Sequence, residues 1–388
     1  MNFTDFLFNG TNATTLHEFS AIELVQLYYT PILVYLGTIG NALSMVVFFK
    51  TKLKKLSSSY YLASLALSDS VFLLSLFVVW LNMVDVNWFN QHGVCQLMVY
   101  LTGACSFLSV WLVLAFTVER FIAVRYPLLR QSVCTVSRAK MIISILVVLS
   151  ILIFSPLLLF ARVQVVPQKT TELCTIDSDF ENFATVFNII DTAVTFVIPV
   201  FVIVILNTCI SRTIWKLGSV RRKLTYRGAL PEVPTHSKRE STKGCRVKPS
   251  VHLSQNKITK MLLVVSTVCL CLNFPSYLMR VLTYLIELRV IEDVNIPLFL
   301  TVQHCCLQLF NTNFGINFVL YCISGQNFRK AMQSLFCKRR LGRTGTTAFT
   351  VSESRTQSSA SSITKKRKNT NTTNNGIEQE LMTIHVYN

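Results

Sequence analysis

Residues 141–161 read MIISILVVLSILIFSPLLLFA, a stretch without a single charged side chain. A helix needs about 20 such residues to cross the hydrocarbon core of a bilayer. Similar apolar blocks recur along the chain, and we predict seven spans, at about 25–49, 60–83, 97–124, 139–161, 184–210, 258–286 and 297–323. The predicted fold is therefore an all-α membrane protein with a seven-transmembrane helix bundle.

The composition of the whole chain agrees with a membrane protein. Of its 388 residues, 51% are hydrophobic and 14% are charged, whereas soluble domains carry about 25% charged residues. The mean hydropathy is +0.47. These values exclude an ordinary cytosolic enzyme, a disordered protein and a small disulfide scaffold. The twelve cysteines are scattered, without the paired spacing of a zinc site.

The distribution of Lys and Arg predicts the orientation. Residues 1–49 and 84–96 contain no Lys or Arg, and the loops on that side hold only Arg162, Lys169, Arg280 and Arg289. The other 33 of the 37 basic residues fall on the opposite side, which is cytoplasmic by the positive-inside rule. We therefore expect a multi-pass plasma-membrane protein with an extracellular N-terminus. The net charge of +18 then reflects topology and attraction to anionic membrane lipid, and not nucleic-acid binding.

The predicted outer side carries further signals. Three glycosylation sequons begin at Asn2, Asn9 and Asn12. The segments on this side contain twelve acidic residues and four basic ones. Such a surface would concentrate a cationic ligand, although simple solvation of the loops is the alternative interpretation.

The segments outside the spans divide the chain further. Residues 1–24 are expected to form the glycosylated tail, and 211–257 a long basic cytoplasmic loop with helical extensions at both ends. Residues 324–337 have the spacing of a short amphipathic helix on the inner leaflet, with Cys337 as a candidate for palmitoylation. Residues 338–388 are expected to be a disordered, Ser/Thr-rich cytoplasmic tail that can be phosphorylated.

Short motifs in order along the chain now support a specific resemblance. They are Gly40-Asn41, Leu65-Ala-Leu-Ser68-Asp69, Trp88, Cys95, Glu119-Arg120-Phe121, Cys174, Pro199, Pro275 and Asn317-Phe-Val-Leu-Tyr321. Over about 25–337 the chain resembles the rhodopsin-like (class A) G-protein-coupled receptors. The resemblance implies a receptor that activates a heterotrimeric G protein and has no catalytic residues. Arrestin and receptor kinases would bind the tail.

The resemblance also implies roles for single residues. Cys95 and Cys174 would form a disulfide on the oxidising side. Glu119 and Arg120, with Asn317 and Tyr321, would form the switch that contacts the G protein. Asp69 is a buried carboxylate that needs polar partners, and Asn41, Ser109, Asn313 and Asn317 could supply them. In the family this cluster holds a sodium ion, and the alternative is a water-filled polar network. No other cofactor is expected.

The chain departs from the family pattern at several positions. Phe318 replaces the proline of the motif in the seventh span, Asn273 stands two residues before Pro275 where tryptophan is usual, and Asn207 replaces a tyrosine. The tryptophan of the fourth span is absent. This variant set resembles the FMRFamide-receptor-like invertebrate neuropeptide receptors.

The choice of ligand follows from residues at pocket positions. Thr102 stands where amine receptors have an aspartate, and 297–323 contain no Lys for a retinal Schiff base. A peptide therefore fits better than a monoamine or retinal; a non-peptide small hormone or a lipid is the alternative. The expected pocket residues are Trp80, Met83, Thr102, Asp191, Tyr277, Arg280, Tyr284, Gln303 and Leu307. Asp191 and Arg280 would either pair with each other or contact the ligand, Asp191 binding a ligand arginine.

Two other classes of membrane protein fit less well. A transporter often shows an internal repeat, and none is visible in this chain. A membrane enzyme needs converging catalytic groups, yet only His304 of the six histidines lies in a predicted span.

Overall fold

The computed structural model of the protein describes residues 21–165, 172–227, 250–288, 290–291 and 295–341. Within these residues, seven helical segments are long and apolar enough to cross a membrane, as predicted. They consist of α2 (Ala21–Lys50), α3 (Ser57–Leu81), α4 (Val94–Arg125), α6 (Val136–Phe154) followed by α7 (Leu157–Phe160), α8 (Glu181–Asp191) followed by η4 (Thr192–Val197) and α9 (Ile198–Arg227), α10 (Ser250–Glu287), and α11 (Ile296–Ser324). The short connecting elements are η1 (Lys52–Lys55), η2 (Asn82–Val84), α5 (Arg130–Val133) and η3 (Ser178–Phe180).

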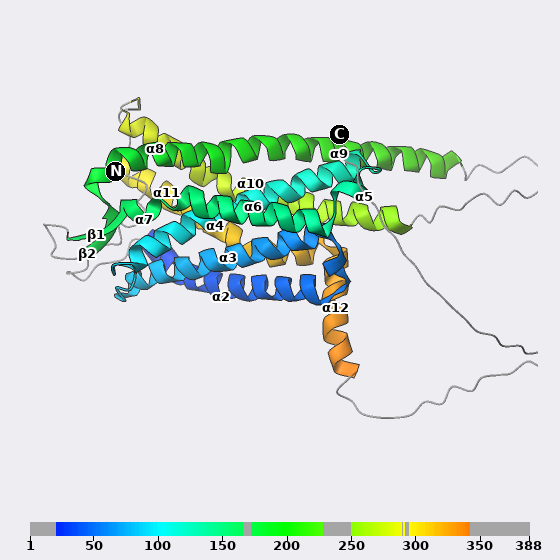
Figure 1. Cartoon of the computed structure of the whole chain (residues 1–388), viewed down its shortest axis with the longest axis horizontal. Helices are drawn as coiled ribbons and strands as arrows, with labels where there is room; N and C mark the ends of the chain where they lie inside the picture. The colour runs from blue at the N-terminus through cyan, green and yellow to red at the C-terminus, as the bar shows by residue number, and fades with distance from the viewer. Residues whose placement is uncertain (1–20, 166–171, 228–249, 289, 292–294, 342–388) are drawn as a thin grey trace, which may run out of the picture. The chain divides into compact units, whose positions relative to one another are not determined.

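The long helices lie side by side in one bundle (Figure 1). Helix α4 contacts α3, α6, α9 and α10, and α11 contacts α2, α3 and α10. Helices α4 and α11, the two spans richest in polar residues, therefore have several helical neighbours each. Such a position suits them, because neighbouring helices can satisfy buried polar groups and lipid cannot.

The two ends of the bundle carry different elements. One end, called here the hairpin end, carries the antiparallel strands β1 (Ala161–Val165) and β2 (Glu172–Ile176). At the other end, called the α12 end, α12 (Gln326–Leu341) turns away from the direction of the long helices (Figure 1). The predicted amphipathic helix is thus present, and it continues four residues beyond the expected 337.

Helices α9 and α10 extend beyond the predicted spans. Helix α9 continues to Arg227, and α10 begins at Ser250. The helical extensions expected at both ends of the long basic loop are therefore present. The middle of that loop lies outside the described residues.

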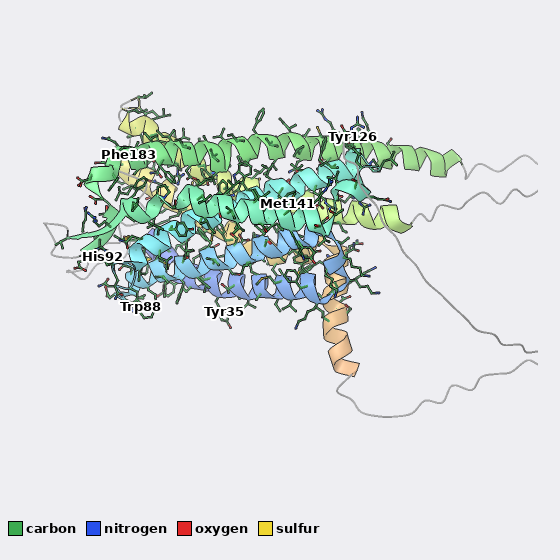
Figure 2. The ribbon with its side chains drawn as sticks, viewed as in Figure 1. Tyr35, Trp88, His92, Tyr126, Met141 and Phe183 are labelled. Atoms are coloured by element: carbon green, nitrogen blue, oxygen red, sulfur yellow. A yellow bond between two sulfur atoms is a disulfide. The ribbon has the colours of Figure 1, made fainter. Side chains whose placement is uncertain are left out.

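The outer surface of the bundle is apolar, as lipid contact requires. Tyr35 is 68% exposed and Met141 is 57% exposed, and Figure 2 shows Tyr35 at the edge of the bundle. The interior near the α12 end is an apolar cluster that includes Leu112, Phe116 and Tyr321. Because these side chains are buried against one another, they hold together the helix ends that carry the residues of the predicted switch.

Helices α2 and α11 approach each other closely at two glycines. A Cβ atom added to Gly37 would lie 2.8 Å from the Cα atom of Gly315. A Cβ atom added to Gly315 would lie 2.6 Å from a methyl carbon of Leu33. The close approach therefore depends above all on the absence of a side chain at Gly37, because a side chain at Gly315 would meet only the end of the Leu33 side chain at short distance.

Candidate functional site

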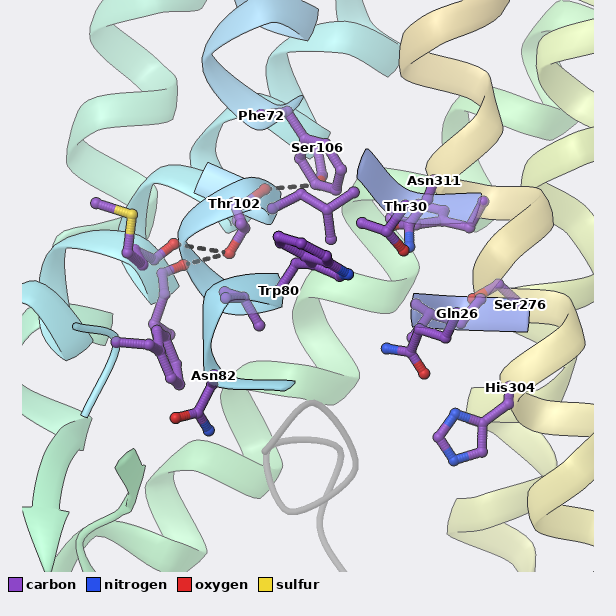
Figure 3. A pocket seen from close by; sticks show the side chains of 18 of the residues that line it. Gln26, Thr30, Phe72, Trp80, Asn82, Thr102, Ser106, Ser276, His304 and Asn311 are labelled. Atoms are coloured by element: carbon purple, nitrogen blue, oxygen red, sulfur yellow. Dashed lines mark hydrogen bonds between the residues drawn. The ribbon is translucent and has the colours of Figure 1, made fainter. Parts of the chain in front are cut away.

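A cavity opens among the helices towards the hairpin end (Figure 3). Its volume of about 190 Å³ is roughly ten times the space that one water molecule needs. Residues of α2, α3, η2, α4, α8, α10 and α11 line it. A space of this size with walls from most of the helices is a candidate ligand site.

Seven of the nine residues predicted to bind ligand line this cavity: Trp80, Met83, Thr102, Asp191, Tyr277, Arg280 and Leu307. Gln303 is buried, and its neighbour His304 lines the cavity instead. Successive residues of a helix point about 100° apart, so a shift of one residue changes the face. Tyr284 lies one turn beyond Arg280 on α10, outside the residues that line the cavity. Ligand contact by all nine stays a prediction.

The sequence interpretation missed the contribution of the first span. Glu23, Gln26 and Thr30 of α2 line the cavity, and Figure 3 labels Gln26 and Thr30 together with His304 of α11 among the lining side chains. The signal was present in the sequence, because these three polar residues are spaced three and four apart. That spacing places them on one face of a helix.

The wall formed by α8 and α10 contains a buried ion pair. Nη1 of Arg280 donates to Oδ2 of Asp191 at 2.7 Å and to the hydroxyl of Thr192 at 3.1 Å. The hydroxyl of Thr195 donates to Oδ1 of Asp191 at 2.6 Å. Both carboxylate oxygens of Asp191 therefore accept hydrogen bonds from within the protein, and the pairing considered from sequence is present.

A π-helical turn builds this wall. The segment η4 follows Asp191 directly and supplies Thr192, Thr195 and Phe196. The ring of Phe196 stacks on that of Tyr277, with centroids 4.2 Å apart. π-Helical turns inside longer helices are frequent at functional sites because they redirect side chains. Here the turn directs two hydroxyls towards one ion pair.

The hairpin is fixed to the bundle beside the cavity. Cys95, at the start of α4, and Cys174, in β2, form the predicted disulfide, and both are buried. Oδ1 of Asn90 accepts a hydrogen bond of 3.1 Å from the backbone amide of Cys174. Arg162 and Asp177 form an ion pair of 2.7 Å where the strands enter and leave. The covalent link and these polar contacts hold β2 against the end of α4.

A second polar site lies in the interior, around Asp69. The hydroxyl of Ser109 donates to Oδ1 of Asp69 at 2.9 Å, and Nδ2 of Asn317 donates to Oδ2 at 2.7 Å. Asn41 is fully buried and donates from Nδ2 to the carbonyl of Phe314 at 3.0 Å. The structure thus brings two of the four expected partners, Ser109 and Asn317, into hydrogen bonds with the acid, while Asn41 bonds to the backbone of Phe314 and Asn313 is buried on α11.

The chemistry of this polar site fits a hard cation. Its donors are carboxylate, hydroxyl and amide oxygens, which such cations prefer. Among the described residues, Oδ1 of Asn41 is buried without a hydrogen-bond partner, and an ion or a water would satisfy it. The oxygens of Asp69, Ser109, Asn41, Asn313 and Asn317 are of the kind that the expected sodium ion prefers, and binding of that ion stays a prediction.

The α12 end holds the predicted switch residues. Glu119 and Arg120 form a buried ion pair. The hydroxyl of Ser57, at the start of α3, donates to Oε1 of Glu119 at 2.7 Å. The Ser57 hydrogen bond therefore links α3 to this ion pair of α4.

Two groups beside this ion pair have shifted pKa values. Burial, with the nearby Glu119, raises the pKa of the Cys134 thiol above its ordinary value. Burial, with the nearby Arg120, lowers the pKa of Arg130. The Cys134 thiol also donates weakly to the carbonyl of Glu119, at 3.7 Å. The segment between the third and fourth spans is thus packed against the switch.

Tyr321 completes the set of switch residues. Its side chain is fully buried against Phe48 and Phe328, with ring centroids 5.5 Å away in both cases. Within the described part of the chain, its hydroxyl has no hydrogen-bond partner, and a buried hydroxyl without a partner is costly.

Several predicted positions fall outside the described residues. They are the sequons at Asn2, Asn9 and Asn12, and the tail from 342 onward. The backbone of Cys337 lies within α12, but its side chain is not described.

The sequence can now be compared with known proteins. Residues 40–321 match the family described as 7 transmembrane receptor (rhodopsin family). This match covers the second to sixth spans in full, the last part of the first span from Gly40, and the seventh span as far as Tyr321.

Individual receptors are similar over most of the chain. The somatostatin receptor type 4 of Rattus norvegicus is 25% identical, over 78% of this chain and 70% of its own length. The growth hormone secretagogue receptor type 1 of Sus scrofa is 26% identical, over 82% of this chain and 86% of its own. The neurotensin receptor type 1 of Rattus norvegicus is 29% identical, over 80% and 75%.

Proposed function

This chain belongs to the rhodopsin family of seven-transmembrane receptors, and on that premise we propose that it binds an extracellular neuropeptide and activates a heterotrimeric G protein. It is a multi-pass membrane receptor and not an enzyme. The observation that carries the peptide proposal is the cavity at the hairpin end, because its wall combines aromatic rings with acidic and basic groups. The receptors to which it is similar are named for peptides such as somatostatin and neurotensin.

The orientation in the membrane is part of the proposal. The hairpin end faces outward, because the loops at that end are poor in Lys and Arg. The Cys95–Cys174 disulfide supports this, since disulfides persist outside the cytosol. The α12 end then faces the cytoplasm, with its basic residues at the anionic leaflet.

The ligand reaches the cavity from the hairpin end in this proposal. A peptide end enters between α2, α10 and α11, where the cavity offers aromatic and aliphatic surface from Trp80, Tyr277 and Leu307. The rest of the peptide lies against the hairpin. Insertion of the peptide end changes the packing of α8 and α10 around the Asp191–Arg280 pair.

The signal then passes to the α12 end. Movement of α10 against α4 separates Glu119 from Arg120, and Arg120 becomes available to the G protein. A sodium ion held at Asp69, with Ser109, Asn41, Asn313 and Asn317 as the expected neighbours, would stabilise the resting packing through its positive charge. Such an ion opposes activation because it binds one of two states more tightly.

The test is a screen of amidated neuropeptides on cells that express the chain, with calcium and cyclic AMP as readouts. We expect a response at nanomolar to micromolar peptide that is lost in Arg120→Ala, while binding of labelled peptide is kept. Guanine-nucleotide exchange in isolated membranes should follow the same pattern. A response to lipid extracts and not to peptides would support the alternative ligand class.

A further inference from the structure

We propose that the ring of Phe310 is a gate through which the interior polar site around Asp69 exchanges water and small cations with the cavity. The inference goes beyond the proposed peptide function, because it concerns the access route to the polar site and holds whatever ligand the cavity takes. It depends on how closely the cavity approaches the polar site and on what separates the two.

The floor of the cavity lies one helical turn from the polar site on three helices. The pairs of cavity-lining and polar-site residues are Phe72 and Asp69 on α3, Ser106 and Ser109 on α4, and Phe310 and Asn313 on α11. Members of each pair are three residues apart, which is a rise of about 4.5 Å along a helix. Figure 3 labels Phe72 and Ser106 among the lining side chains. A single layer of side chains therefore separates the cavity from the polar site.

Three aromatic rings fill this layer. The rings of Phe72 and Phe314 stack with their centroids 3.6 Å apart, and both side chains are buried. Phe310 lies edge-on against both, with its centroid 5.9 Å from that of Phe72 and 5.3 Å from that of Phe314. An apolar layer opposes the passage of water and ions. The three rings therefore form a seal between the cavity and the polar site.

Helix α10 adds a small polar residue beside the seal. Tyr277 lines the cavity and contacts Phe310 edge-on, with centroids 6.1 Å apart. One turn further along α10, Asn273 is buried and donates from Nδ2 to Sγ of Cys269 at 3.4 Å. A short amide at this place leaves the separation of cavity and polar site to the rings of α3 and α11.

Polar atoms on the inner side of the seal require water. Among the described residues, Oδ1 of Asn41 and Oδ1 of Asn273 are buried without a hydrogen-bond partner. Ordered water usually satisfies such groups in protein interiors. Asp69 is fully buried in the same region, and a carboxylate there attracts a cation. The polar site therefore needs a route by which water and ions enter.

The route from the α12 end is blocked by a thicker apolar region. Along α3, the next two turns after Asp69 in that direction place Leu65 and Leu62 in the buried apolar cluster. Along α4, the corresponding two turns place Leu112 and Phe116 in it. Two apolar turns oppose an ion more than one layer of rings does. Exchange through the cavity is therefore the easier route.

Phe310 is the ring of the seal that has room to move. Phe72 and Phe314 belong to a buried cluster, whereas Phe310 is only partly buried against it. The other side of Phe310 faces the cavity, whose volume is about 190 Å³. A change of side-chain rotamer moves the ring into that space without any shift of a helix. Rotation of Phe310 therefore opens the seal.

The experiment measures access to the polar site without any peptide. Its reporter is the native Cys269, which is 4% exposed and lies close enough to Asp69 for an electrostatic interaction. A second receptor carries Ser276→Cys on the wall of the cavity together with Cys269→Ala. Cys105→Ala and Cys271→Ser are included in both receptors, so that neighbouring thiols do not compete.

Each receptor is placed in vesicles whose outer surface is the extracellular side. MTSEA, a small cationic thiol reagent, is added outside, and free cysteine inside the vesicles consumes reagent that crosses the lipid. Mass spectrometry of the tryptic fragment 261–280, which contains both reporter positions, follows the modification with time.

In the parent receptor we expect Cys269 to react far more slowly than the Ser276 reporter. Phe310→Ala should raise the Cys269 rate about tenfold, because two aromatic contacts that keep the seal closed are lost. Phe310→Leu keeps an apolar side chain of intermediate size and should raise it less. The matched control is Phe201→Ala, which removes a ring that is 68% exposed on α9 and should leave the rate unchanged.

The Ser276 reporter separates opening of the gate from loss of the fold. Its rate should be the same with and without Phe310→Ala, and if that variant disturbs the cavity, Phe310→Leu decides. A Cys269 rate that neither Phe310 variant raises, or that Phe201→Ala raises as far, would overturn the inference. A parent Cys269 as fast as the Ser276 reporter, or a Ser276 reporter that the reagent does not reach, would also overturn it.

The outcome is separable from that of the proposed function, because labelling requires neither a peptide nor a G protein. A receptor that ignores every peptide yet shows the Phe310-dependent rate at Cys269 would reject the peptide proposal and keep the gate. A peptide response together with an equal Cys269 rate in the parent and in both Phe310 variants would do the reverse.

Discussion

Nδ2 of Asn317 on α11 donates a hydrogen bond of 2.7 Å to Oδ2 of Asp69 on α3, although 248 residues separate the two in sequence. The same carboxylate accepts from Ser109 on α4. Three spans therefore meet at one buried acid in the interior of the bundle, and any ion or ligand that changes this contact changes how the spans pack.

Asp69→Asn should remove the effect of sodium on the receptor. We expect 100 mM sodium to lower agonist affinity about fivefold or more in the unchanged receptor, a typical coupling between two sites. The amide keeps the hydrogen-bonding shape but lacks the charge that holds the ion. Radioligand competition in sodium and in N-methylglucamine buffer measures this, and equal sodium shifts in both receptors would contradict the site.

Arg280→Gln should destabilise the receptor more than the double change Asp191→Asn with Arg280→Gln. The single change leaves Asp191 charged and buried, and breaking one partner of such a pair costs about 3–5 kcal/mol. The double change leaves two neutral amides that can bond to each other. Thermal inactivation of detergent-solubilised receptor compares the two, and a double variant less stable than the single one would refute the coupling.

Ser57→Ala should raise the basal activity of the receptor. The serine hydroxyl donates to Glu119 at 2.7 Å, and a hydrogen bond to a charged group is worth about 1.5–3 kcal/mol. We expect basal nucleotide exchange to increase roughly two- to tenfold. Ser155→Ala, at an exposed serine that bonds only within its own helix, is the matched control and should not change the rate.

Cys95→Ser or Cys174→Ser should abolish ligand binding at the surface. Loss of a native disulfide typically costs about 2–5 kcal/mol, and here it also releases β2 from α4. Cys271→Ser removes an exposed cysteine elsewhere and should leave binding intact. Saturation binding on whole cells, with antibody detection of surface receptor, distinguishes lost binding from lost expression.

Alkylation of Cys134 should be slow at neutral pH and rise steeply with pH. Its thiol pKa lies above the ordinary value because of burial and the nearby Glu119. Since the pKa is raised, the reactive thiolate is scarce at pH 7.5 and increases about tenfold per pH unit below the pKa. Mass spectrometry after brief N-ethylmaleimide treatment between pH 7 and 9 measures this, with glutathione as reference. A rate at pH 7.5 equal to that of glutathione would contradict the packing against Glu119.

The spans and the disulfide could be predicted from sequence because their signals are local. A block such as 141–161 is apolar whatever lies beside it, and Cys95 and Cys174 match positions in a recognised pattern. The predicted limits of the spans differ from the observed helix limits by a few residues, except where α9 continues to Arg227 and where α10 begins at Ser250.

The wall of the cavity was harder to predict for a physical reason. A membrane helix is apolar towards lipid and towards its neighbours, so its sequence does not reveal its rotation about its own axis. Gln303 and His304 show the consequence, since the first was named and the second lines the cavity. The π-helical turn η4 adds one more residue per turn after Asp191, which no periodic pattern anticipates.

The glycine contact between α2 and α11 also limits how this sequence can evolve. Because the backbone of Gly315 occupies the space that a side chain at Gly37 would need, a mutation at Gly37 meets selection before α11 can adjust. Neutral drift through single substitutions is therefore blocked at Gly37, and a lineage can leave glycine there only by changing the spacing of the two helices. We expect saturation mutagenesis to tolerate almost nothing but glycine at position 37, while lipid-facing Tyr35, two residues away, accepts most apolar replacements.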